Sequence, residues 1–365
     1  MSKVTYLLGA GASYGNREVL PLSMQPFMSS DDAKPLTGIG RGLPILQEFS
    51  QAVEQLHGEI ENISNSNEFI TEKKFIQSEI LAPLLQISKE FPTIDTYAKM
   101  LYATKQSLQY MKFKSQLSIF FMIWQRLHNN DLRYDSFVAS LIDADTLSLP
   151  SLTILSWNYD MQFELAYSRY IIENPALWKI WDQLNVYCKT NTTLPKTSIN
   201  YPFSFVKLNG SALFHSSERD RQSLRYVLQD TLWCTYSEKD FWHEIYELYT
   251  NSQYKHEFDV PKYKNELAYC WDGNGKNEIL DYITKRSSDS DTLVIIGYSF
   301  PYVNREIDRH IFSSMPNLKT IYVQDVNSIN ISERVKAIYE YLKKDAPRII
   351  LKTDVGQFFI PNELG

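Results

Sequence analysis

The chain has 365 residues, 44% of them hydrophobic and 14% aromatic, enough to bury the core of one large domain or two smaller ones. A formal net charge of −6 argues against broad nonspecific binding to nucleic acid, and no apolar run is long enough to span a membrane. The first apolar run is short and enters a glycine-rich turn directly, so we expect no secretory leader and a cytoplasmic protein.

Residues 4–8 form an apolar, partly β-branched run that predicts a buried parallel strand. Gly9, Gly11 and Gly15 follow it. Glycine lets the backbone turn sharply and approach a phosphate, and N–H groups at a helix start attract negative charge. The pattern predicts a nucleotide phosphate site. Its spacing, G-x-G-x-x-x-G, is one residue longer than the dinucleotide fingerprint, so an ordinary strand-to-helix turn is the alternative.

The next segment, residues 16–44, is rich in proline and glycine and predicts a long irregular loop that covers the phosphate site. A helix is expected from residue 43 to 56, a polar loop over 58–71, and a helix over 73–90 that Pro83 kinks or breaks. A long amphipathic helix over 95–127 follows, with Thr93 or Asp95 as its cap.

The remainder of the chain alternates strands with helices, which predicts an α/β fold with a Rossmann-like doubly wound parallel sheet. We expect a single domain over residues 1–365, with mostly helical insertions at about 45–130 and 215–290. The predicted strands cover 152–157, 203–208, 292–297, 318–323 and 348–351, and the predicted helices 161–172, 304–313 and 332–343.

The three cysteines, Cys188, Cys234 and Cys270, are widely spaced and include no C-x-x-C pair. Because a structural zinc usually needs four ligands with close cysteine pairs, we expect no zinc ribbon and no other metal site. Buried thiols in a reducing compartment are the simpler interpretation.

Four predicted strands end in small or polar residues, and ligands bind at the carboxyl ends of the strands in open α/β sheets. We therefore predict one shared pocket. The four strand ends are residues 9–13, 156–160, 209–211 and 297–299.

The same segments carry a family resemblance. Gly-Ala-Gly-Ala-Ser at 9–13, Asn-Tyr-Asp at 158–160, Lys-Leu-Asn-Gly-Ser at 207–211 and Ile-Gly-Tyr-Ser-Phe-Pro at 296–301 resemble the ordered motifs of the sirtuin-related SIR2-like domain. The resemblance is greatest to bacterial SIR2-like proteins of anti-phage defence, and it covers residues 3 to about 330.

This resemblance implies that the pocket binds NAD, with one group of residues at each part of the ligand. Asn158 would lie near the nicotinamide ribose, where Asp160 would help to orient the site. An Asn158 that merely caps the following helix is the alternative. The pyrophosphate would be surrounded by Gly9, Ala10, Gly11, Ala12 and Ser13, the adenosine side by Gly297 and Ser299, and the adenine ribose by Asp325 or Asn327.

The implied activity is cleavage of NAD to nicotinamide and ADP-ribose in anti-phage defence, with a partner protein of the defence system and a homo-oligomer as further expectations. The family usually has a histidine base where this chain has Asn209, and an amide cannot take up a proton at neutral pH. Either His215 or another group replaces that base, or the pocket binds NAD or an ADP-ribose-like ligand as a sensor or complex subunit without turnover.

Two other activities of NAD-binding folds fit less well. Deacetylation ranks lower because the zinc-holding cysteines of that branch are absent. Hydride transfer ranks lower still because the acid expected at the end of a second strand is not seen.

Overall fold

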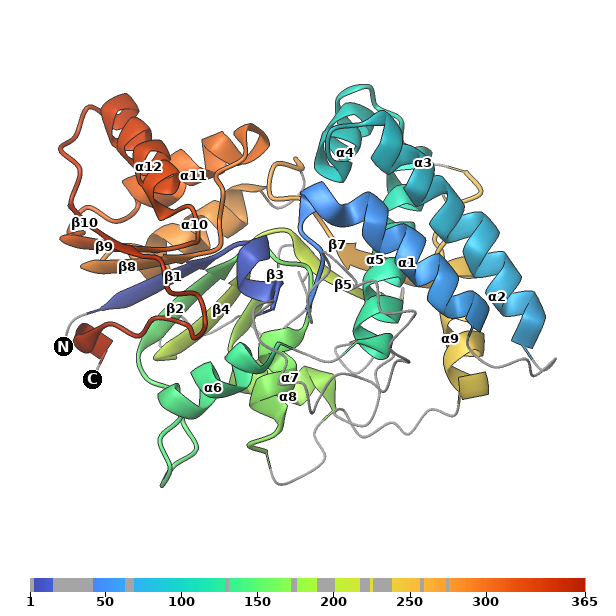
Figure 1. The fold of residues 1–365 in the computed structure, drawn as a ribbon, viewed down its shortest axis with the longest axis horizontal. Coiled ribbons are helices and arrows are strands. Elements are labelled where there is room, and N and C mark those ends of the chain that lie inside the picture. The colour runs from blue at the N-terminus through green and yellow to red at the C-terminus, as the bar shows by residue number, and fades with distance from the viewer. Residues whose placement is uncertain are drawn as a thin grey trace, which may run out of the picture.

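The computed structural model (Figure 1) describes residues 3–15, 42–62, 69–128, 131–171, 176–188, 201–216, 224–225, 238–256, 259–273 and 276–364. Seven parallel strands form one sheet in the order β10-β9-β8-β1-β2-β4-β3, which confirms the α/β, Rossmann-like prediction. The strands are β1 (Val4–Leu8), β2 (Leu152–Ser156), β3 (Val186–Cys188), β4 (Phe203–Lys207), β8 (Thr292–Ile296), β9 (Thr320–Gln324) and β10 (Arg348–Lys352).

Helices cover both faces of this sheet, so its central strands are buried on both sides and read as continuous apolar runs. Neighbouring residues of one strand point to opposite faces: Tyr6 belongs to one buried cluster and Leu7 to the other. In Figure 1, α10 (Lys276–Ser287), α11 (Arg305–Ser313) and α12 (Ser328–Leu342) lie above the sheet, and α6 (Leu132–Leu141), α7 (Gln162–Ser168) and α8 (Leu177–Gln183) below it.

The central strands end level with one another. Leu8, the last residue of β1, pairs with Ser156 on one side and Ile296 on the other. The chain leaves β1 toward β2 on one side and later returns to β8 on the other, which makes the end of β1 the topological switch point of the sheet. The residues that follow these strands therefore begin at the same edge.

A helical region packs beside the sheet, as predicted for residues 45–130. It consists of α1 (Phe49–Asn62), α2 (Ile70–Ile76), α3 (Ala82–Glu90), α4 (Ile94–Ala103), α5 (Ser107–Leu127) and, from later in the chain, α9 (Glu238–Thr250). The insertion at 215–290 is not purely helical, because it contributes to a small antiparallel sheet in the order β6-β5-β7. These strands are β5 (Gly210–Ser216), β6 (Leu224–Arg225) and β7 (Tyr263–Leu267).

The single helix predicted over 95–127 is wrong. The structure has two helices, α4 and α5, separated at Lys105, whose φ of 58° lies in the left-handed region and interrupts the helical backbone. Thr93 is the N-cap of α4, since its side chain accepts the Thr96 N–H at 3.1 Å. The predicted loop over 58–71 is too long, because α1 continues to Asn62 and α2 begins at Ile70.

Pro83 neither ends nor breaks its helix. A five-residue π-helical turn, Gln77–Leu81, precedes it and leads into α3. Proline has no N–H to offer the carbonyl four residues earlier, that of Glu79. This carbonyl instead accepts the Gln116 side-chain amide at 2.7 Å and the Tyr249 hydroxyl at 3.3 Å, which ties the turn to α5 and α9.

Several elements escaped the sequence-based prediction, namely α6, α8 and β3. Residues 16–41, most of the predicted cover, and Cys234 lie outside the described residues. Across the part of the chain that the structure describes, no helix combines the length and the apolar character needed to cross a bilayer.

Candidate functional site

A cavity of about 530 Å³ lies at the carboxyl edge of the large sheet. This volume falls within the ~300–1,000 Å³ typical of small-molecule sites, and the position is the switch point at which open α/β sheets bind ligands. The cavity brings together ten of the predicted site residues: Ala10, Gly11, Ser13, Asn158, Asp160, Asn209, Gly297, Ser299, Asp325 and Asn327. Gly9 and Ala12 belong to the same loop but not to the wall formed by the described residues.

The glycine loop after β1 and the loop after β8 interlock. The Gly9 N–H donates to the Ile296 carbonyl at 3.0 Å, and the Gly11 N–H to the Gly297 carbonyl at 2.9 Å. A Cβ added at Gly11 would come within 2.7 Å of the Gly297 Cα, and Gly297 itself has a φ of 59°. Glycine is therefore required here by the approach of two backbones, whether or not a phosphate binds.

This interlocking limits the donors that the loop has for a pyrophosphate. The Ala12 N–H donates to the Gly9 carbonyl at 2.9 Å, so three amides of the predicted phosphate loop, those of Gly9, Gly11 and Ala12, already have protein acceptors. The loop is followed by one turn of 3₁₀ helix, Ala10–Ser13, rather than a long helix. Any phosphate would have to use the remaining donors.

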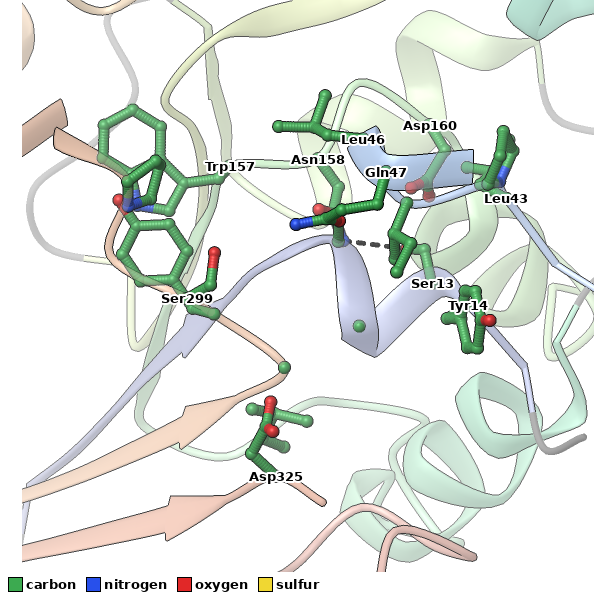
Figure 2. Close-up of a pocket in the computed structure, with 18 of the residues that line it drawn as sticks. Ser13, Tyr14, Leu43, Leu46, Gln47, Trp157, Asn158, Asp160, Ser299 and Asp325 are labelled. Carbon is green, nitrogen blue, oxygen red and sulfur yellow. Dashed lines mark hydrogen bonds between the residues drawn. The ribbon is translucent and has the colours of Figure 1, made fainter. Parts of the chain in front are cut away.

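Asn158 ties the end of β2 to the glycine loop (Figure 2). Its Nδ2 donates to the Gly9 carbonyl at 2.9 Å and to the Ser13 Oγ at 2.8 Å. The amide nitrogen is thus used by the protein, which leaves the carbonyl oxygen for a ligand in the cavity. The alternative in which Asn158 only caps α7 is wrong, because Asp160 accepts the Gln162 N–H at the start of that helix, at 3.0 Å.

Asp160 is 5% exposed and lies next to the buried ion pair of Lys207 and Glu164. Burial raises the pKa of its carboxyl, and the nearby Lys207 opposes that rise. Lys207 is completely buried, donates to the Glu164 carboxylate at 2.7 Å and also bonds the Asp160 backbone carbonyl. The pair holds the turn that carries Asp160.

Asn209 has a fixed side chain at 3% exposure. Its Oδ1 accepts the Cys270 N–H at 3.0 Å, and its side chain lies beside the Tyr159 hydroxyl. The side chain therefore orients its neighbours and offers no base.

His215 does not replace that base. It lies further along β5, where its Nδ1 contacts the Glu266 carboxylate of β7. It is not among the described residues that line the cavity. The expectation that His215 turns toward the pocket is therefore corrected, because β5 carries the side chain into a contact with the small sheet.

Asp95 is a wall residue that the sequence analysis considered only as a helix cap. Since Thr93 caps α4, the Asp95 carboxylate is available for another contact, and it accepts the Tyr159 hydroxyl at 2.9 Å. Burial raises the pKa of Asp95 to about 6, although the hydroxyls of Tyr159 and Tyr269 oppose the rise. The sequence offers two candidate caps for one helix, Thr93 and Asp95, so one of them is free for another role. That was the one signal in the sequence for Asp95.

Arg133 is the one lysine or arginine among the described wall residues, and the sequence analysis also missed it. Its guanidinium pairs with Asp131, and Nη2 donates to the carbonyls of Gly11 at 3.2 Å and Ala12 at 3.1 Å. Arg133 therefore holds the glycine loop through its carbonyls, and most of its guanidinium N–H groups already donate to protein acceptors.

The opposite end of the cavity is formed by the loops after β8 and β9 (Figure 2). Asp325 accepts the Asn327 N–H at 2.7 Å, and burial raises the pKa of its carboxyl. Trp157 stacks on Tyr298 with ring centroids 5.5 Å apart, and its buried indole N–H has no acceptor among the described residues. This end combines the aromatic surface of Trp157 and Tyr298 with the carboxylate of Asp325.

Comparison with known proteins finds no match for this chain, either among protein-family models or among curated proteins. Within the described ranges, no group of three or more histidine, cysteine, aspartate or glutamate side chains is placed to hold a metal ion.

Proposed function

We propose that the cavity binds NAD and that the protein hydrolyses it to nicotinamide and ADP-ribose. One observation carries the proposal: the loops after β1, β2 and β8 place Asn158, Asp160 and two interlocked glycine turns around one cavity at the switch point of a Rossmann-like sheet. The motifs in these loops are those that resemble the SIR2-like domain.

The wall suits the chemistry of this bond cleavage. Among the described residues of the wall, three acids, Asp95, Asp160 and Asp325, face the cavity, and Arg133 is the one basic side chain and pairs with Asp131. As the bond from ribose C1′ to the nicotinamide nitrogen breaks, its electron pair neutralises the leaving ring and positive charge develops on the ribose. Fixed oxygens such as Oδ1 of Asn158 stabilise that charge and position the attacking water.

Binding without turnover is the second candidate. It is favoured by Asn209, which occupies the position of the family's histidine and is already hydrogen-bonded on its oxygen. A role in anti-phage defence, with a partner protein and self-association, rests on the resemblance alone, and we propose it together with a cytoplasmic location for either candidate.

The direct test incubates purified protein with NAD and measures nicotinamide release together with a binding isotherm. Asn158→Ala is expected to lower turnover by about 10²–10³-fold, the scale for removing one oxygen or donor that stabilises transition-state charge. Binding should change less, because the other loops of the cavity remain.

Ser13→Ala is the matched control. It removes one acceptor of the Asn158 amide but keeps the Asn158 oxygen, so its loss of turnover should be smaller. Equal losses in both variants would assign Asn158 to holding the glycine loop. Wild-type protein that binds NAD without releasing nicotinamide would favour the sensor, and protein that does not bind NAD would refute the proposal.

A further inference from the structure

We propose that Asp95, acting through the hydroxyl of Tyr159, takes up the proton released when water attacks the ribose. The inference rests on the proposed NAD hydrolysis and names the group that does the work of the missing histidine. Asp95 is a positioning and relay residue in this scheme, and the Tyr159 hydroxyl is the group that meets the reacting water.

A hydrogen-bonded pair, Tyr159 and Asp95, lies beside Asn209 at the position of the missing base. The side chain of Asn209 lies beside the Tyr159 hydroxyl, and its Oδ1 is fixed by the Cys270 N–H at 3.0 Å. The Tyr159 hydroxyl donates to Asp95 Oδ1 at 2.9 Å. The tyrosine proton is therefore directed at the Asp95 carboxylate, which is the arrangement needed to pass a proton to it.

The pair also lies next to the proposed reaction centre. Tyr159 directly follows Asn158, and Asp95, Tyr159 and Asn209 all line the cavity. Asp95 comes from the first turn of α4, on the helical wall, so the relay joins the two sides of the site.

The surroundings suit Asp95 as the final acceptor. Its carboxyl is buried against two tyrosines, Tyr159 from the loop after β2 and Tyr269 from the loop after β7, and within the described chain these are the titratable groups that influence its pKa. Further out, Tyr110 interacts with Tyr159 and Tyr269. With a pKa of about 6, the carboxyl is ionised at neutral pH and is still a stronger base than an exposed aspartate.

The step balances as follows. Water oxygen forms a bond to ribose C1′ while the C1′–nitrogen bond breaks and its electron pair stays on nicotinamide. The water proton moves to the Tyr159 oxygen as the tyrosine proton moves to the Asp95 carboxylate. The proton on Asp95 is then lost to solvent, so the products are nicotinamide, ADP-ribose and one proton.

The test compares Asp95→Asn and Tyr159→Phe with Asp272→Asn in nicotinamide release and in NAD binding. Asp272 is a matched control, because its buried carboxylate accepts the Tyr110 hydroxyl at 2.6 Å but does not line the cavity. Both relay variants should lose about 10²–10⁴-fold in kcat, the usual contribution of general-base catalysis, with NAD affinity nearly unchanged. Asp272→Asn should keep both.

A pH profile separates a relay from a merely structural pair. Wild-type kcat should rise with pH through about 6 and then level off, because the carboxylate must be ionised to take the proton. The residual activity of Asp95→Asn should lack this rise. Asp160 faces the same cavity and its pKa is also raised by burial, so Asp160→Asn is measured in parallel and should keep the rise.

The possible outcomes distinguish the relay from NAD hydrolysis and from NAD binding. Turnover that survives in Asp95→Asn, or in Tyr159→Phe alone, would overturn the relay while leaving NAD hydrolysis in place. Wild-type protein that binds NAD without turnover would overturn the relay and leave the binding function. Wild-type protein without affinity for NAD would remove both.

Discussion

The cavity has two walls that are built in different ways. The wall from the large sheet is made of strand-end loops whose backbones interlock at Gly11 and Gly297. The wall from the helical region is made of side chains, such as Ile94, Asp95 and Phe121, that project from α4 and α5. Backbone interlocking restricts residue types and leaves motifs in the sequence, whereas side-chain packing leaves only an apolar stripe. Sequence motifs therefore locate the first wall and miss the second.

The largest expected effect is on the free energy of unfolding, and it should differ between a buried lysine of the large sheet and one of the helical region. Lys207→Met should destabilise the protein by about 3–5 kcal/mol, because it leaves the completely buried Glu164 carboxylate without its partner. Lys114→Met in α5 is the counterpart on the helical side. Lys114 makes no ion pair with a described residue, and burial lowers its pKa, so its replacement should cost much less.

Urea denaturation of both variants at neutral pH measures this difference in the free energy of unfolding. Similar losses in the two variants would contradict the view that the wall from the sheet depends on the Lys207–Glu164 pair.

A smaller effect concerns the glycines. Gly11→Ala should cost about 1–3 kcal/mol, the usual range for overpacking, because its Cβ would meet the Gly297 backbone at 2.7 Å. A Cβ at Gly58, in α1, meets no atom within 4 Å, so Gly58→Ala should stabilise by about 0.5–1 kcal/mol. Thermal unfolding distinguishes the two. A Gly11→Ala protein of wild-type stability would show that the two loops can separate.

Gly11 is also a poor position at which to test phosphate binding. A side chain there disturbs the packing of two loops before it reaches any ligand, so loss of NAD affinity in a Gly11 variant would not show that a phosphate lies there.

The smallest effects are expected at the position of the missing histidine. Asn209→His should raise turnover, but by less than the ~10²-fold lower end of general-base catalysis, because Tyr159 and Asp95 already serve that need and the imidazole must replace the hydrogen bond to the Cys270 N–H. His215→Ala, its control, should leave turnover unchanged, since His215 faces Glu266. A larger gain from Asn209→His, or a loss from His215→Ala, would move the base away from Asp95.

The sequence was sufficient for six of the seven strands of the large sheet, because the central ones, β1, β2, β4 and β8, are buried throughout and read as apolar runs. The predicted starts of the strands at residues 152, 203, 292 and 348 match β2, β4, β8 and β10. Strand β3 was missed because three residues, Val186–Cys188, carry too little pattern, and the break at Lys105 was missed because a left-handed lysine has no distinctive neighbours.

In the site, too, the residues next to predicted strands were found and those on docked helices were missed. Asn158, Asp160 and Asn209 were found because each directly follows a strand, where the backbone fixes the position of the side chain. Asp95 and Arg133 were not, because their positions depend on how α4 and α6 dock against the sheet. Local periodicity contains no information on that docking. His215 was misplaced because the sequence did not reveal the pairing of β5 with β7, which brings it to Glu266.

Pro83 has a consequence that reaches beyond its own helix. Pro83 has no N–H to donate to the Glu79 carbonyl. Two side chains distant in sequence, Gln116 and Tyr249, donate hydrogen bonds to that oxygen. The π-helical turn Gln77–Leu81 is thereby joined to α5 and α9 at one atom. Since α5 also packs against α4, the turn before Pro83 is connected through α5 to the helix that carries Asp95.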